Sequence, residues 1–204
     1  VMNMGQTRWY GKPNGTNTYV VALDPAMGTG GDFAAIQVFE LPTYKQIAEW
    51  RHNTTPIPAQ IRILKDICNY IKECCSNDGQ NIYWSVENNS IGEGALIVIR
   101  DMGEENIPGM CVSEPIRKGH VRKFRKGFNT THSTKISACT RLKNMVENDK
   151  LIINSKVLVS ELKAFVASGS SFKAKPGEND DLVSACLLLS LIHISEPTRQ
   201  KPIS

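Results

Sequence analysis

Apolar residues follow two patterns along the chain. Short continuous runs are typical of strands, and residues three or four positions apart are typical of helices. Residues 18–24 read TYVVALD, a run of aromatic and β-branched residues that is typical of a buried strand. Further strands are predicted at 33–41, 44–51, 81–86, 109–113 and 151–153, with a short edge strand around residues 8–10. Because the strands at 18–24, 33–41 and 44–51 follow one another directly, we expect them to pair antiparallel.

Apolar residues three and four positions apart predict helices at 56–75, 91–102, 133–148 and 157–166. Ser133 is the predicted cap of the third helix, and residues 168–179 are predicted to form a flexible connector. A last helix begins at Asp180 or Asp181 and is apolar almost all round, so it must pack across a sheet. Consecutive strands followed by alternating helices and strands indicate an α/β domain whose mixed central sheet is flanked by helices.

Length and composition favour one soluble domain. The 204 residues are 41% hydrophobic and 22% charged, as in ordinary globular chains. Apolar runs are too short to span a membrane, and the first residues lack a signal-peptide layout. We expect residues 1–17 to be the remnant of a linker, 18–190 the domain, and 191–204 a tail that is disordered or was added to the natural sequence. The six cysteines form no Cys-x-x-Cys pair and are predicted to be reduced core thiols.

Positive charge is concentrated in one segment, residues 117–126. The segment contains six basic residues and no acid, and leaving these six out changes the formal net charge of the chain from +4 to −2. Such a segment suits contact with phosphate groups, which provides affinity without reading bases. A solubilising loop is the alternative. The candidate DNA-binding residues are Arg117, Lys118, Arg122, Lys123, Arg125 and Lys126.

Acidic residues stand at the boundaries of three apolar elements. Asp24 ends the first core strand, Glu87 follows the strand at 81–86, and Asp181, preceded by Asp180, opens the last helix. An acid at the edge of a core is costly unless it is paired or binds a metal. Phosphodiester hydrolysis uses two divalent ions about 4 Å apart, held by clustered carboxylates. The alternative is that Asp180 and Asp181 only cap their helix and that Glu87 is an ordinary strand-end acid.

Three stretches of sequence around these acids resemble a known family. They are VVALDPA at 20–26, WSVENN at 84–89 and NDDLVSA at 179–185. They resemble the acidic motifs of the nuclease domain of large terminase subunits, the DNA-packaging motors of tailed bacteriophages, over roughly residues 18–190. The resemblance implies a ribonuclease H-like (resolvase-like) fold and metal-dependent endonucleolytic cutting of concatemeric double-stranded viral DNA. It implies two Mg²⁺ or Mn²⁺ ions bound by Asp24, Glu87 and Asp181, with Asp180 as a weaker candidate.

The same resemblance implies partners. Family members carry an N-terminal packaging ATPase, but this sequence has no Gly-x-x-x-x-Gly-Lys-[Ser/Thr] loop. We therefore expect an isolated C-terminal domain that works with that ATPase, a portal and a small terminase subunit in the cytoplasm of the infected bacterial host. The basic segment would grip DNA during packaging, and no membrane is involved.

Three other interpretations remain open from the sequence. A Holliday-junction resolvase or a ribonuclease H would use similar acids on another substrate. A sugar-kinase or actin-like phosphate-binding domain also has an acid followed by Gly and Thr, as residues 24–31 do, but it needs a larger chain. A non-catalytic DNA-binding module would keep the basic segment and use the acids structurally.

Overall fold

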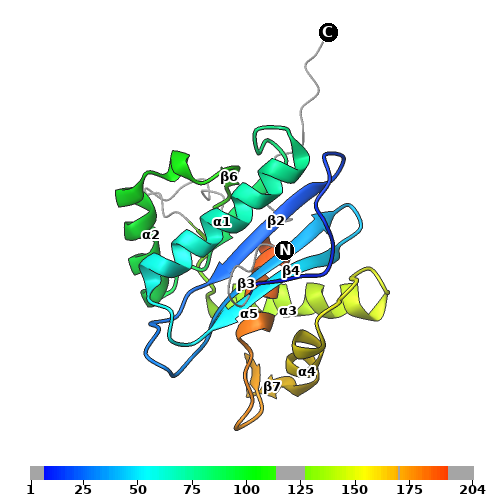
Figure 1. Cartoon of the computed structure of the whole chain (residues 1–204). Coiled ribbons are helices and arrows are strands. Elements are labelled where there is room, and N and C mark those ends of the chain that lie inside the picture. Colours follow the sequence, from blue (N-terminus) through cyan, green and yellow to red (C-terminus); the bar gives the residue numbers. More distant parts are fainter. Residues whose placement is uncertain (1–6, 114–126, 170, 193–204) are drawn as a thin grey trace, which may run out of the picture.

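A six-stranded mixed sheet forms the centre of the computed structural model, which describes residues 7–113, 127–169 and 171–192 (Figure 1). In the order β1-β4-β3-β2-β5-β6, β2 pairs antiparallel with β3, β3 with β4, and β4 with β1. β5 pairs parallel with both β2 and β6. The predicted α/β class with a mixed sheet is confirmed. The strands are β1 (Arg8–Trp9), β2 (Thr18–Asp24), β3 (Ala34–Leu41), β4 (Lys45–His52), β5 (Ile82–Val86) and β6 (Met110–Cys111).

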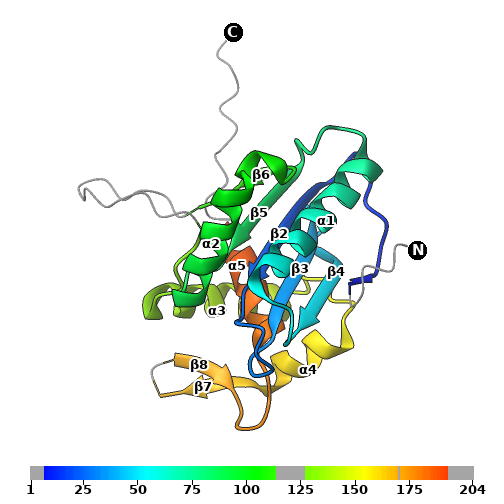
Figure 2. The same ribbon diagram turned by 60° about the vertical axis from the view of Figure 1, so that its left-hand side comes forward.

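Helices cover both faces of the sheet (Figures 1 and 2). α1 (Ile57–Cys75) and α2 (Ser90–Met102) lie on one face, with the short 3-10 helix η1 (Glu104–Asn106) after α2. α3 (His132–Glu147) and α5 (Asp181–Ile192) cover the other face. α4 (Lys156–Ala164) leads into a hairpin of β7 (Phe165–Ser168) and β8 (Ser171–Ala174), which stands at one end of the molecule.

The side chains of β2 alternate between two hydrophobic cores. Val21 and Leu23 belong to the core under α1, while Val20 and Ala22 belong to the core under α5. This alternation follows from the two-residue period of a strand. Because both faces are covered, residues 19–23 of β2 are all buried, and the strand ends at the charged Asp24.

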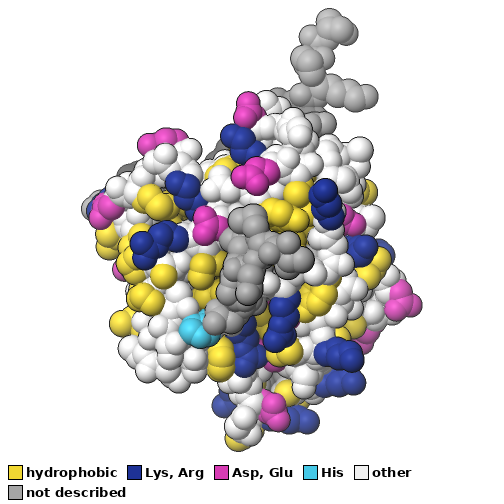
Figure 3. Space-filling view, in the orientation of Figure 1, with side chains coloured by type: hydrophobic (Ala, Val, Ile, Leu, Met, Phe, Trp, Pro, Cys, Tyr) yellow, Lys and Arg dark blue, Asp and Glu magenta, His cyan; other side chains and the backbone are white. Residues whose placement is uncertain are grey.

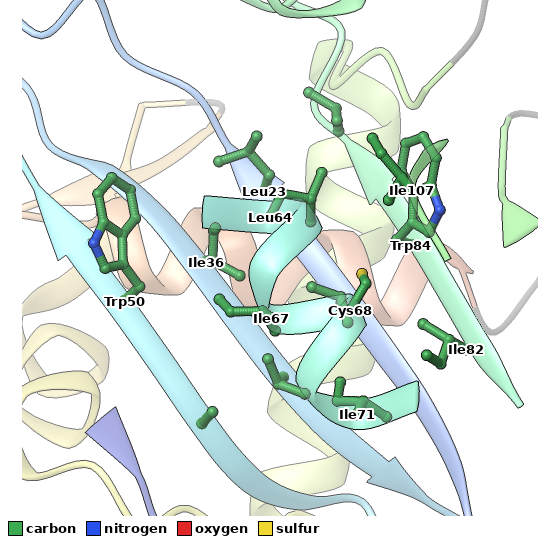
Figure 4. Close-up of a cluster of buried hydrophobic side chains, with 14 of the residues drawn as sticks. Leu23, Ile36, Trp50, Leu64, Ile67, Cys68, Ile71, Ile82, Trp84 and Ile107 are labelled. Carbon is green, nitrogen blue, oxygen red and sulfur yellow. The ribbon is translucent and has the colours of Figure 1, made fainter. Parts of the chain in front are cut away.

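Two cores therefore anchor the elements that carry the acids. Under α1, the side chains of Leu64, Ile67, Cys68 and Ile71 repeat at helical spacing and are fully buried over the strands (Figure 4). On the opposite face α5 is buried on almost every side, as its all-round apolar sequence predicted.

The structure corrects several predicted boundaries. α3 is capped by Thr131, whose hydroxyl accepts the N–H of Thr134 at 3.3 Å, so the prediction of Ser133 as cap is wrong. The predicted connector at 168–179 is also wrong, because residues 165–168 and 171–174 pair as an antiparallel hairpin. The stretch 151–153 contributes one bridge, Lys45 to Ile152, and no strand.

Outside the sheet centre, the short edge strand predicted near residue 9 is confirmed, since Arg8 and Trp9 pair with β4. Residues 1–6 and 193–204 lie outside the described part, and the domain boundaries stay predictions. None of the six cysteines forms a disulfide, and four of them are buried as expected, whereas Cys74 and Cys111 are only partly buried. Within the described ranges, none of the helices has the length and apolarity needed to cross a bilayer.

Candidate metal centre

Asp24 and Glu87 leave neighbouring parallel strands at the same end. The register of β2 and β5 pairs Leu23 with Val86, and the Glu87 N–H donates to the Leu23 carbonyl at 2.9 Å. Asp24 and Glu87 are thus the next residues of two strands that end side by side. Burial is the largest cause that raises the pKa of Asp24, and the nearby Glu87 carboxylate raises it further.

Glu87 is held by the turn that starts α2. Asn89 caps this helix by accepting the N–H groups of Ile91 and Gly92 at 3.0 and 2.8 Å, and its amide donates to Glu87 Oε2 at 3.2 Å. A Cβ atom on Gly92 would lie 1.8 Å from the Glu87 carbonyl oxygen, so only glycine fits there. The sequence WSVENN therefore fixes both the backbone and the carboxylate of Glu87.

Asp180 and Asp181 come from the opposite face of the sheet, at the start of α5. Asp181 is the first residue of the helix, and the carbonyl of Asp180 accepts the Ser184 N–H at 2.8 Å. The Asp180 side chain accepts the Ala174 N–H of β8 at 3.2 Å. This bond connects the hairpin to the start of α5.

The acids act on one another electrostatically. Burial raises the pKa of Asp24 well above its ordinary value, and Glu87, Asp181 and Asp180 raise it further by their negative charges. Burial also raises the pKa of Asp181 to about 6, against the opposing charge of Arg51 and with added repulsion from Asp180 and Asp32. Acids from the end of β5 and from the start of α5 thus influence a single position at the end of β2.

These acids have the donor chemistry that a divalent cation requires. Carboxylate oxygens are hard ligands, and Mg²⁺ keeps several waters, so one or two carboxylates plus a substrate phosphate can bind it. Within the described residues, no three His, Cys, Asp or Glu side chains are already arranged around a single ion position. Asp24 and Glu87 provide the close pair, and ligation by all four acids stays a prediction.

Sequence reasoning missed two residues beside the acids. Arg51, in β4, pairs with the carboxylate of Glu161 from α4, and its guanidinium lies 3.9 Å from the centre of the Phe33 ring. Burial raises the pKa of Glu161 to about 7, although the charge of Arg51 lowers it. The pair is separated by 110 positions in the sequence, so no local pattern could have indicated it.

The predicted DNA-binding residues lie in a part of the chain that the structure does not describe. Arg117, Lys118, Arg122, Lys123, Arg125 and Lys126 all fall within 114–126. The described chain enters this segment after Ser113 and leaves it at Gly127, whose N–H donates to Ser113 Oγ at 3.0 Å. Glu87 forms a bridge with Phe128, so this described flanking residue lies next to the candidate metal centre.

A mixed sheet with acids at the ends of adjacent strands and at the start of a helix on the other face defines the ribonuclease H-like class. The family model described as "Terminase RNaseH-like domain" matches residues 21–191. The chain belongs to this family, as its sequence motifs indicated.

Solved structures of terminase nucleases share the fold. The large terminase nuclease of thermophilic phage G20c with bound magnesium superposes with a TM-score of 0.66 at 16% identity, covering 92% of this chain and 87% of that one. The same nuclease with bound cobalt gives 0.65 at 16% identity over the same shares of the two chains. The large terminase nuclease domain of Thermus phage P74-26 gives 0.62 at 17% identity, covering 91% and 85%.

Proposed function

We propose that this domain is a metal-dependent endonuclease that cuts concatemeric double-stranded viral DNA during packaging. The observation that carries the proposal is the gathering of acids at the end of β2, where burial and neighbouring negative charges raise the pKa of Asp24. Buried like charges are costly unless a cation compensates them. The phosphodiester backbone brings further negative charge, which adds to the need for cations.

Asp24, Glu87 and Asp181 would hold the metal, with Asp180 beside them. Two Mg²⁺ or Mn²⁺ ions would supply an activated water and neutralise the charge on the phosphate and the leaving oxygen. Asn89 fixes the Glu87 carboxylate by its amide hydrogen bond. The end of β2 fixes Asp24, because the preceding five residues are buried. The magnesium and cobalt in the G20c nuclease crystals support divalent metal binding.

DNA would lie along the sheet end that carries the acids. Phe128 bridges to Glu87, and the Gly127 N–H donates to Ser113 Oγ. Because these flanking residues lie close to the acids, we expect the six positive charges of 117–126 to contact the DNA backbone close to the cut. Further lysines lie on α4 and on the hairpin. In the view of Figure 3, Lys and Arg side chains gather on the lower part of the molecule, where Figure 1 shows α4 and β7. Lys173 and Lys175 are exposed and flank Ala174, the partner of Asp180.

Other components would come from the packaging machine. The partners we propose are double-stranded DNA, an N-terminal packaging ATPase domain, a portal and a small terminase subunit, in the cytoplasm of the infected bacterial host. Family membership supports the first of these most directly. The domain by itself would cut DNA but would not move it.

The test is cleavage of supercoiled plasmid in Mg²⁺ or Mn²⁺. The wild-type domain should nick and linearise the plasmid, EDTA should stop the reaction, and Asp24→Ala should abolish cutting while DNA affinity is kept. Asp101→Ala is the matched control, because Asp101 is an exposed acid on α2 whose side chain is 64% accessible and pairs only with neighbouring Arg100 in the described structure.

Each contrary result would contradict a different part of the proposal. Cutting that survives in Asp24→Ala would refute the assignment of the acids. DNA binding without any cutting would favour the non-catalytic DNA-binding module. Preference for a four-way junction or for an RNA–DNA hybrid over plasmid DNA would favour the resolvase or ribonuclease H alternatives.

A further inference from the structure

The start of α5 is capped in an unusual way. Asp180 occupies the cap position, since its carbonyl accepts the Ser184 N–H. An aspartate there ordinarily accepts the N–H of the second or third helical residue with its own side chain. In this structure those two N–H groups, of Leu182 and Val183, donate to Glu161 Oε2 at 2.9 and 3.2 Å.

Glu161 comes from another helix and is fixed from both sides. Its side chain is 5% accessible, and its second oxygen, Oε1, accepts from Arg51 Nη1. The Arg51 guanidinium is itself held over the Phe33 ring. One carboxylate thus connects α4, the end of β4 and the start of α5, and both of its oxygens accept from charged or main-chain donors.

We propose that Glu161 is a positioning residue that caps α5 in place of Asp180, so that the carboxylates of Asp180 and Asp181 remain available to a divalent cation. The consequence for metal binding rests on the proposed function, whereas the capping of α5 by Glu161 does not. Asp180 holds the cap position, from which an aspartate ordinarily accepts the Leu182 and Val183 N–H groups. If Glu161 were removed, Asp180 would compete for these donors and would leave its bond to Ala174.

Amide hydrogen exchange of the metal-free domain tests the capping directly. In the wild type, the Leu182, Val183 and Ala174 amides should be protected. In Glu161→Ala we expect at least tenfold faster exchange, either at Leu182 and Val183 or, if Asp180 takes over the cap, at Ala174. The Ser184 amide is the internal reference, because its bond to the Asp180 carbonyl does not involve Glu161. Unchanged exchange at Leu182, Val183 and Ala174 would overturn the proposal.

Titration with Mn²⁺ alone, followed by calorimetry, tests the consequence for the metal. Glu161→Ala should weaken Mn²⁺ binding about 10- to 100-fold, the usual effect of losing a group that orients metal ligands. Glu161→Gln keeps an acceptor oxygen, so its loss should be smaller, and this partial rescue separates positioning from simple destabilisation. Glu147→Ala is the matched control, since Glu147 forms an exposed pair with Lys143 on α3.

The outcomes separate the two proposals. A wild-type Mn²⁺ affinity in folded Glu161→Ala overturns the positioning role. If Glu161→Ala does not fold, Glu161→Gln decides, and an affinity equal to that of the wild type together with unchanged exchange overturns it. If the wild type neither binds Mn²⁺ nor cuts DNA, the proposed function fails, while the exchange experiment still decides whether Glu161 caps α5.

Discussion

At the scale of single residues, the proposed chemistry depends on acids that are unfavourable for the fold by themselves. Asp24 lies among other acids at the end of a buried strand, and burial and the charge of Glu87 are the main causes of its raised pKa. A native protein keeps such a group when it serves a site. The sequence indicated these acids because each follows or opens an apolar run, but it did not indicate Arg51 or Glu161, which meet across 110 positions.

Replacing Asp24 by Asn should separate stability from metal binding. The amide has nearly the same size and removes a partly buried negative charge that other acids repel, so Asp24→Asn should melt at a higher temperature than the wild type in EDTA. Addition of Mg²⁺ should raise the melting temperature of the wild type by binding to the folded state, and this increase should disappear in Asp24→Asn. Thermal melts with and without Mg²⁺ measure both effects. A lower melting temperature for Asp24→Asn in EDTA would contradict the repulsion.

The stability of the metal-free domain should fall with rising pH. Burial is the main cause that raises the pKa of Asp181 to about 6 and that of Glu161 to about 7. A carboxyl with a higher pKa in the folded state binds its proton more tightly there, so stability is lost as the pH rises from the unfolded value through the folded one. The window therefore runs from about pH 4 to pH 7.

Melts in EDTA at half-unit steps from pH 4.5 to 8 measure this dependence. Asp181→Asn should flatten the curve, since it removes one of the two groups, whereas Asp101→Asn should not, because that acid is exposed. A melting temperature that rises across the window in the wild type, relative to Asp181→Asn, would be the opposite of what we expect.

At the scale of elements, helices with a long apolar repeat could be predicted from the sequence, whereas the pairing of short strands could not. α1 was predicted closely because its apolar residues repeat over 19 residues and a proline precedes it. The β7–β8 hairpin was missed because each strand has only four residues and none of them is buried, so no apolar pattern indicates the pairing. Thr131 was missed as a cap because several hydroxyl residues precede α3, and only the backbone geometry selects one.

The helix α5 should contribute much of the stability. Leu187 is 2% accessible and belongs to the core between α5 and the sheet. Leu187→Ala should lower the free energy of unfolding by about 2–5 kcal/mol, as expected for a buried leucine. Denaturant melts measure the loss, with Ile97→Ala as control, since Ile97 on α2 is 50% accessible. A loss no larger than that of the control would mean that α5 is not central to the fold.

At the scale of the whole molecule, the sheet brings distant sequence segments to one end. Asp24, Glu87 and Asp181 are separated by 63 and 94 positions in the sequence, yet two parallel strands and a helix on the other face bring Glu87 and Asp181 near enough to raise the pKa of Asp24, after burial as the main cause. The order of strands could be predicted only in part, because β5 pairs with β2 through a long crossover by α1. The net charge of +4 does not indicate a DNA-binding surface by itself, because six of the basic residues lie in the one segment 117–126.

The basic segment gives the prediction that belongs to this scale, because DNA would extend well beyond the acids. Arg122→Ala combined with Lys123→Ala should weaken DNA binding by a similar factor for all sequences, since phosphate contacts carry no base information. The slope of log affinity against log salt should become shallower by about 1 for each phosphate-binding side chain that is removed. Binding titrations at several salt concentrations, on two unrelated duplexes, measure both quantities.

Lys72→Ala with Arg100→Ala is a charge-matched control, since both residues pair with local acids on the α1 and α2 face. An unchanged salt slope in the first variant would mean that the segment serves solubility, whereas a slope that also changes in the control would show that net charge alone governs binding.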